Sequence, residues 1–189
     1  VIWHHDNETI IHPSPHPAYE LWQSDLAGNK LAVVASNTSR VKHLSRVNNG
    51  KDFSFVSYLL NKDIHFKSKN QVDVELENST VMDYLPALAN NSEHYAFVSK
   101  RTTTAEVYLN TLVSRESNSL KGELSGAGES KQLTDFNNPV KLYDLAFSPN
   151  DSQLMILADN QIFIAHLQDM SVRKLPLDKI AIVGVSWQD

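Results

Sequence analysis

Apolar and polar positions alternate along short stretches of this chain, and tight polar turns separate the stretches. The clearest example runs from Leu145 to Leu157, where two apolar runs flank the polar segment Ser148–Ser152. Alternation with a period of two is typical of a half-buried β-strand, and Pro, Asn and Asp favour a tight turn. We therefore predict a strand, a turn and a second strand in this stretch.

The same pattern recurs along the chain. The first apolar run of each copy ends at Trp3, at about Arg46, and at Leu88, Phe147 and Trp187, so the gaps are 43, 42, 59 and 40 residues. Three of these gaps match the roughly 40–45 residues of a four-stranded propeller blade. The long gap contains a run rich in Ser, Gly and Glu at about 114–130, which we expect to be a surface insertion, mobile or partly disordered.

A third strand is expected after each hairpin, with an aromatic residue among aliphatic ones. These strands fall at 20–26, 63–66, 106–112 and 161–167, and closing strands fall at 130–134 and 171–175. Helical periodicity is scarce: 81–85 fits one helical turn, but Pro86 disfavours its continuation. The predicted fold is all-β, with four-stranded blades of the β-propeller type. The approximate units are 1–42, 43–84, 85–140, 141–180 and a partial unit 181–189.

These repeats resemble the TolB-like β-propeller repeat, a relative of the WD repeat. That repeat consists of an aromatic residue, Ser-Pro-Asp-Gly and a basic residue, then Ile-Ala-Phe, a strand such as Ile-Tyr, and Asp-Leu. Leu145–Leu157 matches the first part, Tyr95–Arg101 the second part and Glu106–Leu109 the third strand. Five turn positions depart from the pattern, with other residues in place of Pro or Gly: His5, Asn7, Asn90, Ser92 and Ser152.

The resemblance implies a propeller fold, and the sequence shows no catalytic signature, so we expect a non-catalytic binding module. Similar propellers serve as sensor halves of regulators like CadC and ToxR, in which a winged-helix DNA-binding domain and one transmembrane helix precede a periplasmic domain. We therefore expect a ligand- or protein-binding sensor module in the periplasm, with the parent protein anchored in the inner membrane; a cytoplasmic location stays open. The alternatives are the gating propeller of a prolyl-oligopeptidase-like serine peptidase and a TolB-like envelope scaffold.

Composition narrows the partners of this segment. The net charge is −5 and no basic stripe occurs, which argues against binding to nucleic-acid phosphates, so DNA binding is expected only in a missing N-terminal domain. Cysteine is absent, which removes disulfides and thiolate zinc sites. No apolar run of about 18 residues occurs, so no membrane span is expected in this segment.

Four repeats and part of a fifth predict an incomplete propeller. The chain begins with Val1, which fits a processed or excised piece of a longer protein. Closed propellers have about 4–8 blades, so either further blades follow in the parent protein or the last strand completes the first blade in a four-bladed ring. A third option is a homo-oligomer through open blade edges. We favour continuation in the parent protein.

Histidines gather near the N-terminus at His4, His5, His12 and His16. A metal site requires three or four converging ligands, whereas the adjacent His4 and His5 point to different sides of a strand. We therefore interpret these side chains as exposed loop residues. No Gly-x-Ser-x-Gly elbow occurs, and six glycines leave no phosphate-binding loop. We expect no catalytic, cofactor-binding or metal-binding residue, and no cofactor.

Two further residue classes are interpreted as structural. We expect four aspartates to cap backbone N–H groups in turns: Asp25, Asp63, Asp144 and Asp151. Aromatic residues recur at equivalent strand positions, and we expect them in the core between blades: Trp3, Trp22, Tyr108, Phe147, Phe163 and Trp187. A function is expected where the copies differ, in the loop His12–Pro17 and the insertion Ser114–Ser130.

Overall fold

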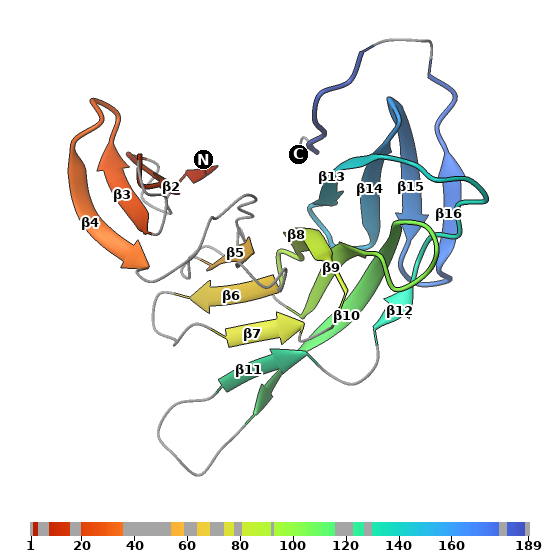
Figure 1. Ribbon diagram of the computed structural model, residues 1–189, viewed down its shortest axis with the longest axis horizontal. Coiled ribbons are helices and arrows are strands. Elements are labelled where there is room, and N and C mark those ends of the chain that lie inside the picture. The colour runs from red at the N-terminus through yellow and green to blue at the C-terminus, as the bar shows by residue number, and fades with distance from the viewer. Residues whose placement is uncertain are drawn as a thin grey trace.

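The computed structural model is that of an all-β protein (Figure 1). Every regular element in the described ranges is a β-strand, and all pairings are antiparallel, so the prediction of an all-β fold is confirmed. Within these ranges no helix has the length and apolar character needed to cross a membrane. The structure describes residues 2–3, 8–15, 20–35, 54–58, 64–68, 74–77, 81–91, 93–115, 123–126, 130–177 and 181–187.

The strands form four sheets. The first sheet contains β1 (Ile2–Trp3), β2 (Thr9–Pro13), β3 (Leu21–Asp25) and β4 (Lys30–Ala35). The second contains β5 (Ser54–Tyr58), β6 (Ile64–Ser68) and β7 (Val74–Glu77). The third contains β8 (Asp83–Leu88), β9 (His94–Ser99), β10 (Glu106–Arg115), β11 (Glu123–Gly126) and β12 (Lys131–Gln132). The fourth contains β13 (Leu142–Phe147), β14 (Gln153–Ala158), β15 (Gln161–His166) and β16 (Ser171–Lys174).

In three of the four sheets, strands that are neighbours in sequence are also neighbours in the sheet. The first and fourth sheets run β1-β2-β3-β4 and β13-β14-β15-β16, and the second runs β5-β6-β7. In the third sheet, β10 pairs with β9, with β12 near its start and with β11 near its end. Figure 1 shows the sheets side by side in an open arc, with β5, β8, β13 and both marked chain ends toward the inner side. The outer strands β4 and β16 lie at opposite ends of the arc.

The third sheet is buried on both faces, and this explains the continuous apolar run of β9. Ala96 and Val98 belong to one core cluster, which also contains Phe147 and Leu154 of the fourth sheet. Side chains alternate across a strand, so the neighbouring positions project to the opposite face. There a second cluster joins Phe97 to Ile64 of β6. A strand that is packed on both faces does not need the apolar–polar alternation of a strand with one solvent-exposed face.

Residues 81–85 do not form the helical turn that their pattern fits. Most of this segment lies in β8, where the ladder with β9 shifts register between Tyr84 and Ala87. Leu85 has a positive φ of 50°, and Pro86 follows it. Proline has no N–H to donate, and within sheets it is found mainly at edges and bulges. The irregular ladder accommodates Pro86, and the third sheet therefore begins at Asp83, close to the approximate boundary expected at 85.

Part of the expected insertion at 114–130 is regular structure. Leu112–Arg115 pairs with Glu123–Gly126, which makes β10 and β11 a hairpin that projects from the third sheet. Figure 1 shows β11 beside β7 of the second sheet. Part of the run is therefore strand, while the mobility expected for it stays a prediction. Residues 116–122 and 127–129 lie outside the described ranges.

The other repeat predictions have mixed outcomes. The hairpins around Leu88 and Phe147 and the third strands at 20–26, 63–66, 106–112 and 161–167 are confirmed as β8–β9, β13–β14, β3, β6, β10 and β15. The turn expected after about Arg46 lies outside the described residues. Residues 181–187 form no strand, although Val185 N donates to Asp144 Oδ2 at 3.1 Å and Trp187 Nε1 donates to Ala146 O at 2.9 Å. This segment therefore lies against β13.

Candidate binding site on the first sheet

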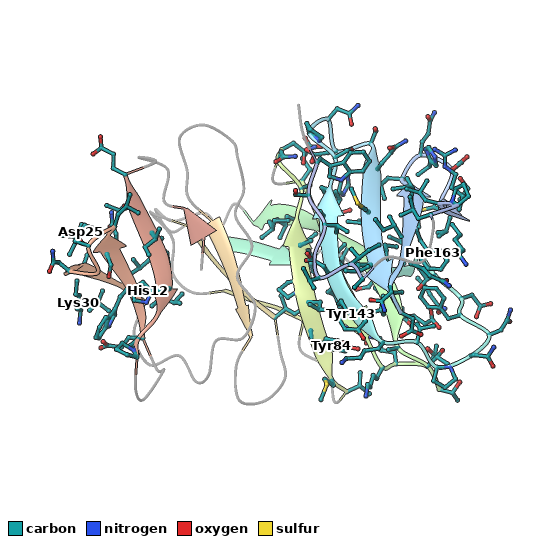
Figure 2. All side chains as sticks on the ribbon, turned by 90° about the horizontal axis from the view of Figure 1, so that it is seen from above. His12, Asp25, Lys30, Tyr84, Tyr143 and Phe163 are labelled. Atoms are coloured by element: carbon teal, nitrogen blue, oxygen red, sulfur yellow. The ribbon has the colours of Figure 1, made fainter. Side chains whose placement is uncertain are left out.

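The first sheet carries a polar cluster built from β2, β3 and the start of β4. Figure 2 shows His12, Asp25 and Lys30 together on this sheet, far from Tyr143 and Phe163 of the fourth sheet. Cross-strand register places His12 opposite Trp22, and Trp22 opposite Val33. Residues directly opposite each other in a sheet share a face. The three side chains therefore project from one face.

A bulge in β4 adds Lys30 to this face. Gln23 pairs with Ala32 and Ser24 pairs with Lys30, so Leu31 is the extra residue of the strand. In a regular strand, positions 30 and 33 would project to opposite faces, but an inserted residue shifts the alternation by one. The bulge thus places Lys30 and Val33 on the same face as Trp22.

The turn before β4 fixes the start of that strand. Gly28 has a φ of 89°, a conformation that glycine adopts without a steric cost. The Asp25 carboxylate accepts hydrogen bonds from Asn29 N and Asn29 Nδ2, both at 2.8 Å. These bonds hold the pKa of Asp25 below its ordinary value, because they favour the ionised carboxylate. The turn after β3 therefore depends on Gly28 and on the Asp25 carboxylate.

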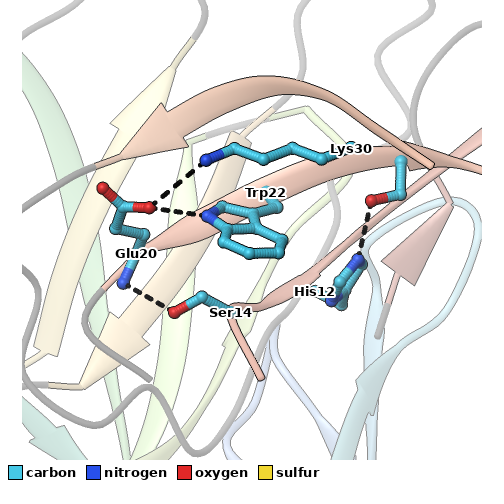
Figure 3. Close-up of polar contacts among 6 residues, drawn as sticks. His12, Ser14, Glu20, Trp22 and Lys30 are labelled. Carbon is cyan, nitrogen blue, oxygen red and sulfur yellow. Dashed lines mark hydrogen bonds and ion pairs between the residues drawn. The ribbon is translucent and has the colours of Figure 1, made fainter. Parts of the chain in front are cut away.

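Lys30, Trp22 and Glu20 form the centre of the cluster (Figure 3). The Lys30 ammonium lies 4.1 Å from the centroid of the Trp22 ring and 3.6 Å from Glu20 Oε2. The same carboxylate oxygen accepts a 2.6 Å hydrogen bond from Trp22 Nε1. This hydrogen bond, followed by the charge of Lys30, lowers the pKa of Glu20. The result is an ionised carboxylate at the edge of an aromatic ring, with a cation on the ring face.

His12 and Ser24 complete the cluster beside Trp22. His12 Nε2 lies 2.9 Å from Ser24 Oγ, and the His12 ring meets Trp22 edge-on with centroids 6.3 Å apart. Ser24 is fully buried, so its hydroxyl is not accessible for attack on a substrate carbonyl. The pair links β2 to β3 and orients the His12 ring toward Trp22.

His12 was expected to be an exposed loop residue, but it lies in β2 and is half-buried. His4, His5, His16 and Asp63 lie outside the described residues. Among the residues that the structure describes, no group of three or more His, Asp or Glu side chains is placed to hold a metal ion. Capping of a turn is confirmed for Asp25 and Asp151, which accept Asn29 N and Asn91 N. Asp144 instead lies within β13, where its carboxylate accepts Leu145 N and Val185 N.

Asp151 caps a turn of the neighbouring sheet. Its carboxylate accepts hydrogen bonds from Asn90 N at 2.7 Å, Asn90 Nδ2 at 2.9 Å and Asn91 N at 2.8 Å. Asn90 Nδ2 also donates to Ser148 O at 3.0 Å. A φ of 56° at Asp151 accompanies this geometry. These bonds join the β8–β9 turn to the β13–β14 turn, so the repeated turns fasten adjacent sheets together.

A shallow hollow of about 380 Å³ lies beside the β13–β14 turn. It is a weaker candidate for a site because its polar side chains already hydrogen-bond one another. Asn150 Oδ1 accepts bonds from Ser148 Oγ at 2.9 Å and from Ser152 Oγ at 2.8 Å. The lining residues are Ser148, Pro149, Asn150, Ser152, Gln153 and Trp187.

The aromatic residues divide into two groups. Tyr108 and Phe147 are buried in the core clusters, as expected, whereas Trp22, Phe163 and Trp187 are only partly buried. The side chain of Trp3 lies outside the described residues. Sequence reasoning missed Glu20 and Lys30 as partners of Trp22. Only a prediction of the bulge at Leu31 would have placed Lys30 on the Trp22 face, because regular alternation puts positions 30 and 33 on opposite faces.

Comparison with known proteins does not assign this chain to a family. No protein-family model matches it. No curated protein matches it either.

Proposed function

We propose that this chain is a non-catalytic binding module of the β-propeller type, and that its first sheet contacts a protein partner. The repeat spacing and the order of the strands support the propeller type. The first, second and fourth sheets are meanders of consecutive strands, and the sheets stand side by side with β5, β8 and β13 toward one side (Figure 1). Repeats of this kind build rigid scaffolds on which a binding surface is carried.

The observation that carries the protein-binding proposal is the exposure of aliphatic side chains around β4. Leu26 is 66% exposed, Leu31 is 56% exposed and Val33 is 45% exposed. Single exposed aliphatic residues are common, but a group that adjoins an aromatic ring and charged side chains is typical of an interaction surface. Trp22 and Lys30 supply that ring and charge on the same sheet. We call these five residues the β4 surface.

The wider role that we propose is sensing, in the extracytoplasmic part of a membrane-anchored bacterial regulator. Its support is the resemblance of the repeats to sensor domains of the CadC and ToxR type, which is an argument from analogy. Binding at the β4 surface would shift the packing or self-association of the module. That shift would bias the DNA-binding part of the parent protein.

The flanks of the coding sequence test this wider role. A winged helix and a single apolar span upstream would support the regulator. A Gly-x-Ser-x-Gly hydrolase domain downstream would instead make the chain a gating propeller. A signal peptide with neither domain would favour an envelope scaffold.

Site-specific photocrosslinking tests the β4 surface. A benzoylphenylalanine placed at position 31 is expected to crosslink to a partner protein, and excess chain without the probe should compete this crosslink away. The same probe at the exposed position 143 is the matched control. With the probe kept at position 31, Leu26→Asp together with Val33→Asp should remove the crosslink while the chain stays folded. Equal crosslinking from both positions, or binding that survives the double variant, would contradict the proposal.

A further inference from the structure

Trp22 and Glu20 together present the two groups that bind an organic cation. The face of an indole ring attracts positive charge through its quadrupole, and a carboxylate beside the ring adds an ion pair. Trp22 Nε1 donates to Glu20 Oε2 at 2.6 Å, which fixes the carboxylate at the ring edge. The ring and the carboxylate are therefore positioned before any ligand arrives.

Lys30 already shows a cation at this position. Its ammonium is 4.1 Å from the Trp22 centroid and 3.6 Å from Glu20 Oε2. The side chains of Lys30 and Glu20 are 40% and 37% exposed. Ion pairs between such exposed groups contribute little, because water solvates both charges well. Lys30 is thus a weakly held occupant that a better cation can displace.

The third sheet shows which cation suits such a site better. Arg101 Cζ lies 5.1 Å from the Phe97 ring and 5.3 Å from the Tyr108 ring, and Arg101 Nη2 is 3.2 Å from Asp83 Oδ2. This chain therefore already combines an aromatic face, a carboxylate and a guanidinium. A guanidinium stacks on a ring and meets a carboxylate with two parallel N–H groups, whereas an ammonium acts as a point charge.

We propose that Trp22 and Glu20 bind an arginine side chain of a protein partner, and that Lys30 occupies this site in the free chain. This inference rests on the proposed function, since it names the chemistry of the partner that contacts the β4 surface. Val33 lies directly opposite Trp22 on the same face and would cover the aliphatic stem of the arginine. An incoming lysine gains no advantage over Lys30, because both carry the same head group.

NMR titration of the full chain tests the site without the partner. N-acetyl-arginine methylamide is expected to shift the Trp22 indole N–H signal, with a smaller shift for the matched lysine compound. Lys30→Ala should raise the affinity for both compounds several-fold, because the internal competitor is gone. Glu20→Gln, confirmed as folded by its amide spectrum, should abolish or strongly weaken the Trp22 shift. Trp22→Leu lacks the indole signal, so its loss of binding is read from the backbone amides of β3 and β4, which should no longer shift.

The matched control is a second lysine over an aromatic ring. Lys141 Nζ lies 4.7 Å from the Tyr143 centroid on the fourth sheet, so Lys141→Ala removes a similar contact away from the site. This variant should leave the Trp22 response unchanged. The site is overturned if the arginine compound leaves the Trp22 signal unmoved in both the natural chain and Lys30→Ala, or if it moves the Trp187 indole equally.

Crosslinking separates this inference from the proposed function. A partner that crosslinks at position 31 equally in the natural chain and in Glu20→Gln would leave protein binding in place and overturn the arginine site. An arginine compound that binds while no specific crosslink forms would overturn the protein partner instead. Binding that needs Trp22 and Glu20 in both assays would support the whole inference.

Discussion

The third and first sheets use the same strand–turn–strand pattern with opposite results for their side chains. In the third sheet, both faces are covered, and even Asp83 and Glu106 are fully buried. Arg101 Nη2 donates to Asp83 Oδ2, and Thr134 Oγ1 donates to Glu106 Oε2. In the first sheet, β4 exposes Leu31 and Val33. A repeat therefore does not determine whether a sheet is core or surface. Whether its side chains are buried depends on the other sheets that pack against it. Side chains that stay exposed are available for binding.

The largest difference is expected for apolar truncation. Phe97 is fully buried, with its ring centroid 5.8 Å from that of Tyr95 and 5.9 Å from that of Tyr108. Phe97→Ala should lower the free energy of unfolding by about 3–5 kcal/mol through lost burial and a new cavity. Leu31→Ala, its counterpart in the first sheet, should change it by less than about 0.5 kcal/mol. Urea denaturation measures both, and similar losses would remove the contrast between the sheets.

The second largest difference in unfolding free energy is expected between substitutions of a buried carboxylate and of an exposed one. Glu106 accepts hydrogen bonds from Thr104 Oγ1 at 2.5 Å, Thr134 Oγ1 at 2.6 Å and Phe136 N at 3.0 Å. Glu106→Gln replaces one acceptor oxygen with a donor and should cost about 2–3 kcal/mol of unfolding free energy, because a buried donor loses its acceptor. Glu20→Gln should have a much smaller effect on urea denaturation, and a larger effect of Glu20→Gln would contradict the comparison.

The third largest effect is expected for the hydrogen bonds between the third and fourth sheets. Asp151→Asn removes the charge and one of the acceptors that hold Asn90 and Asn91, and should cost about 1–2 kcal/mol. Hydrogen exchange should show faster exchange of the Asn90 and Asn91 amides. Asp25→Asn is the matched variant, since its hydrogen bonds stay within one turn of the first sheet. Unchanged exchange at Asn91 would show that the turn contact does not hold the sheets together.

The smallest expected effect is a change in how the free energy of unfolding depends on pH. The pKa values of Glu20 and Asp25 are lowered from ordinary values of 4.5 and 3.8, so their ionised forms stabilise the fold. This contribution is present above those ordinary values and is lost as pH falls through the lowered pKa of each group. Asp25→Asn should therefore flatten the fall in unfolding free energy between about pH 5 and pH 2. Asp135→Asn is the exposed control, and equal flattening by both variants would argue against a specific role for Asp25.

Local pattern predicted most of the strands because period-two alternation and turn residues are local properties. Leu145–Leu157 and Glu106–Leu109 were placed in strands for this reason. Pairing partners are not local, so the path of β10 beyond Leu112 and the burial of Asp83 were missed. The candidate site was missed for a related reason. Lys30 reaches Trp22 only through the bulge at Leu31, and a bulge depends on how two strands align.

The irregular β8 has a consequence for how this protein avoids aggregation. A straight strand at the edge of a sheet offers a row of free N–H and C=O groups, on which a strand of another molecule can grow. In β8, the positive φ of Leu85 interrupts the extended backbone, and Pro86 has no N–H to donate. An invading strand would find its ladder interrupted after a few bonds. Leu85 and Pro86 together therefore make β8 a poor template for strand addition at this edge of the third sheet.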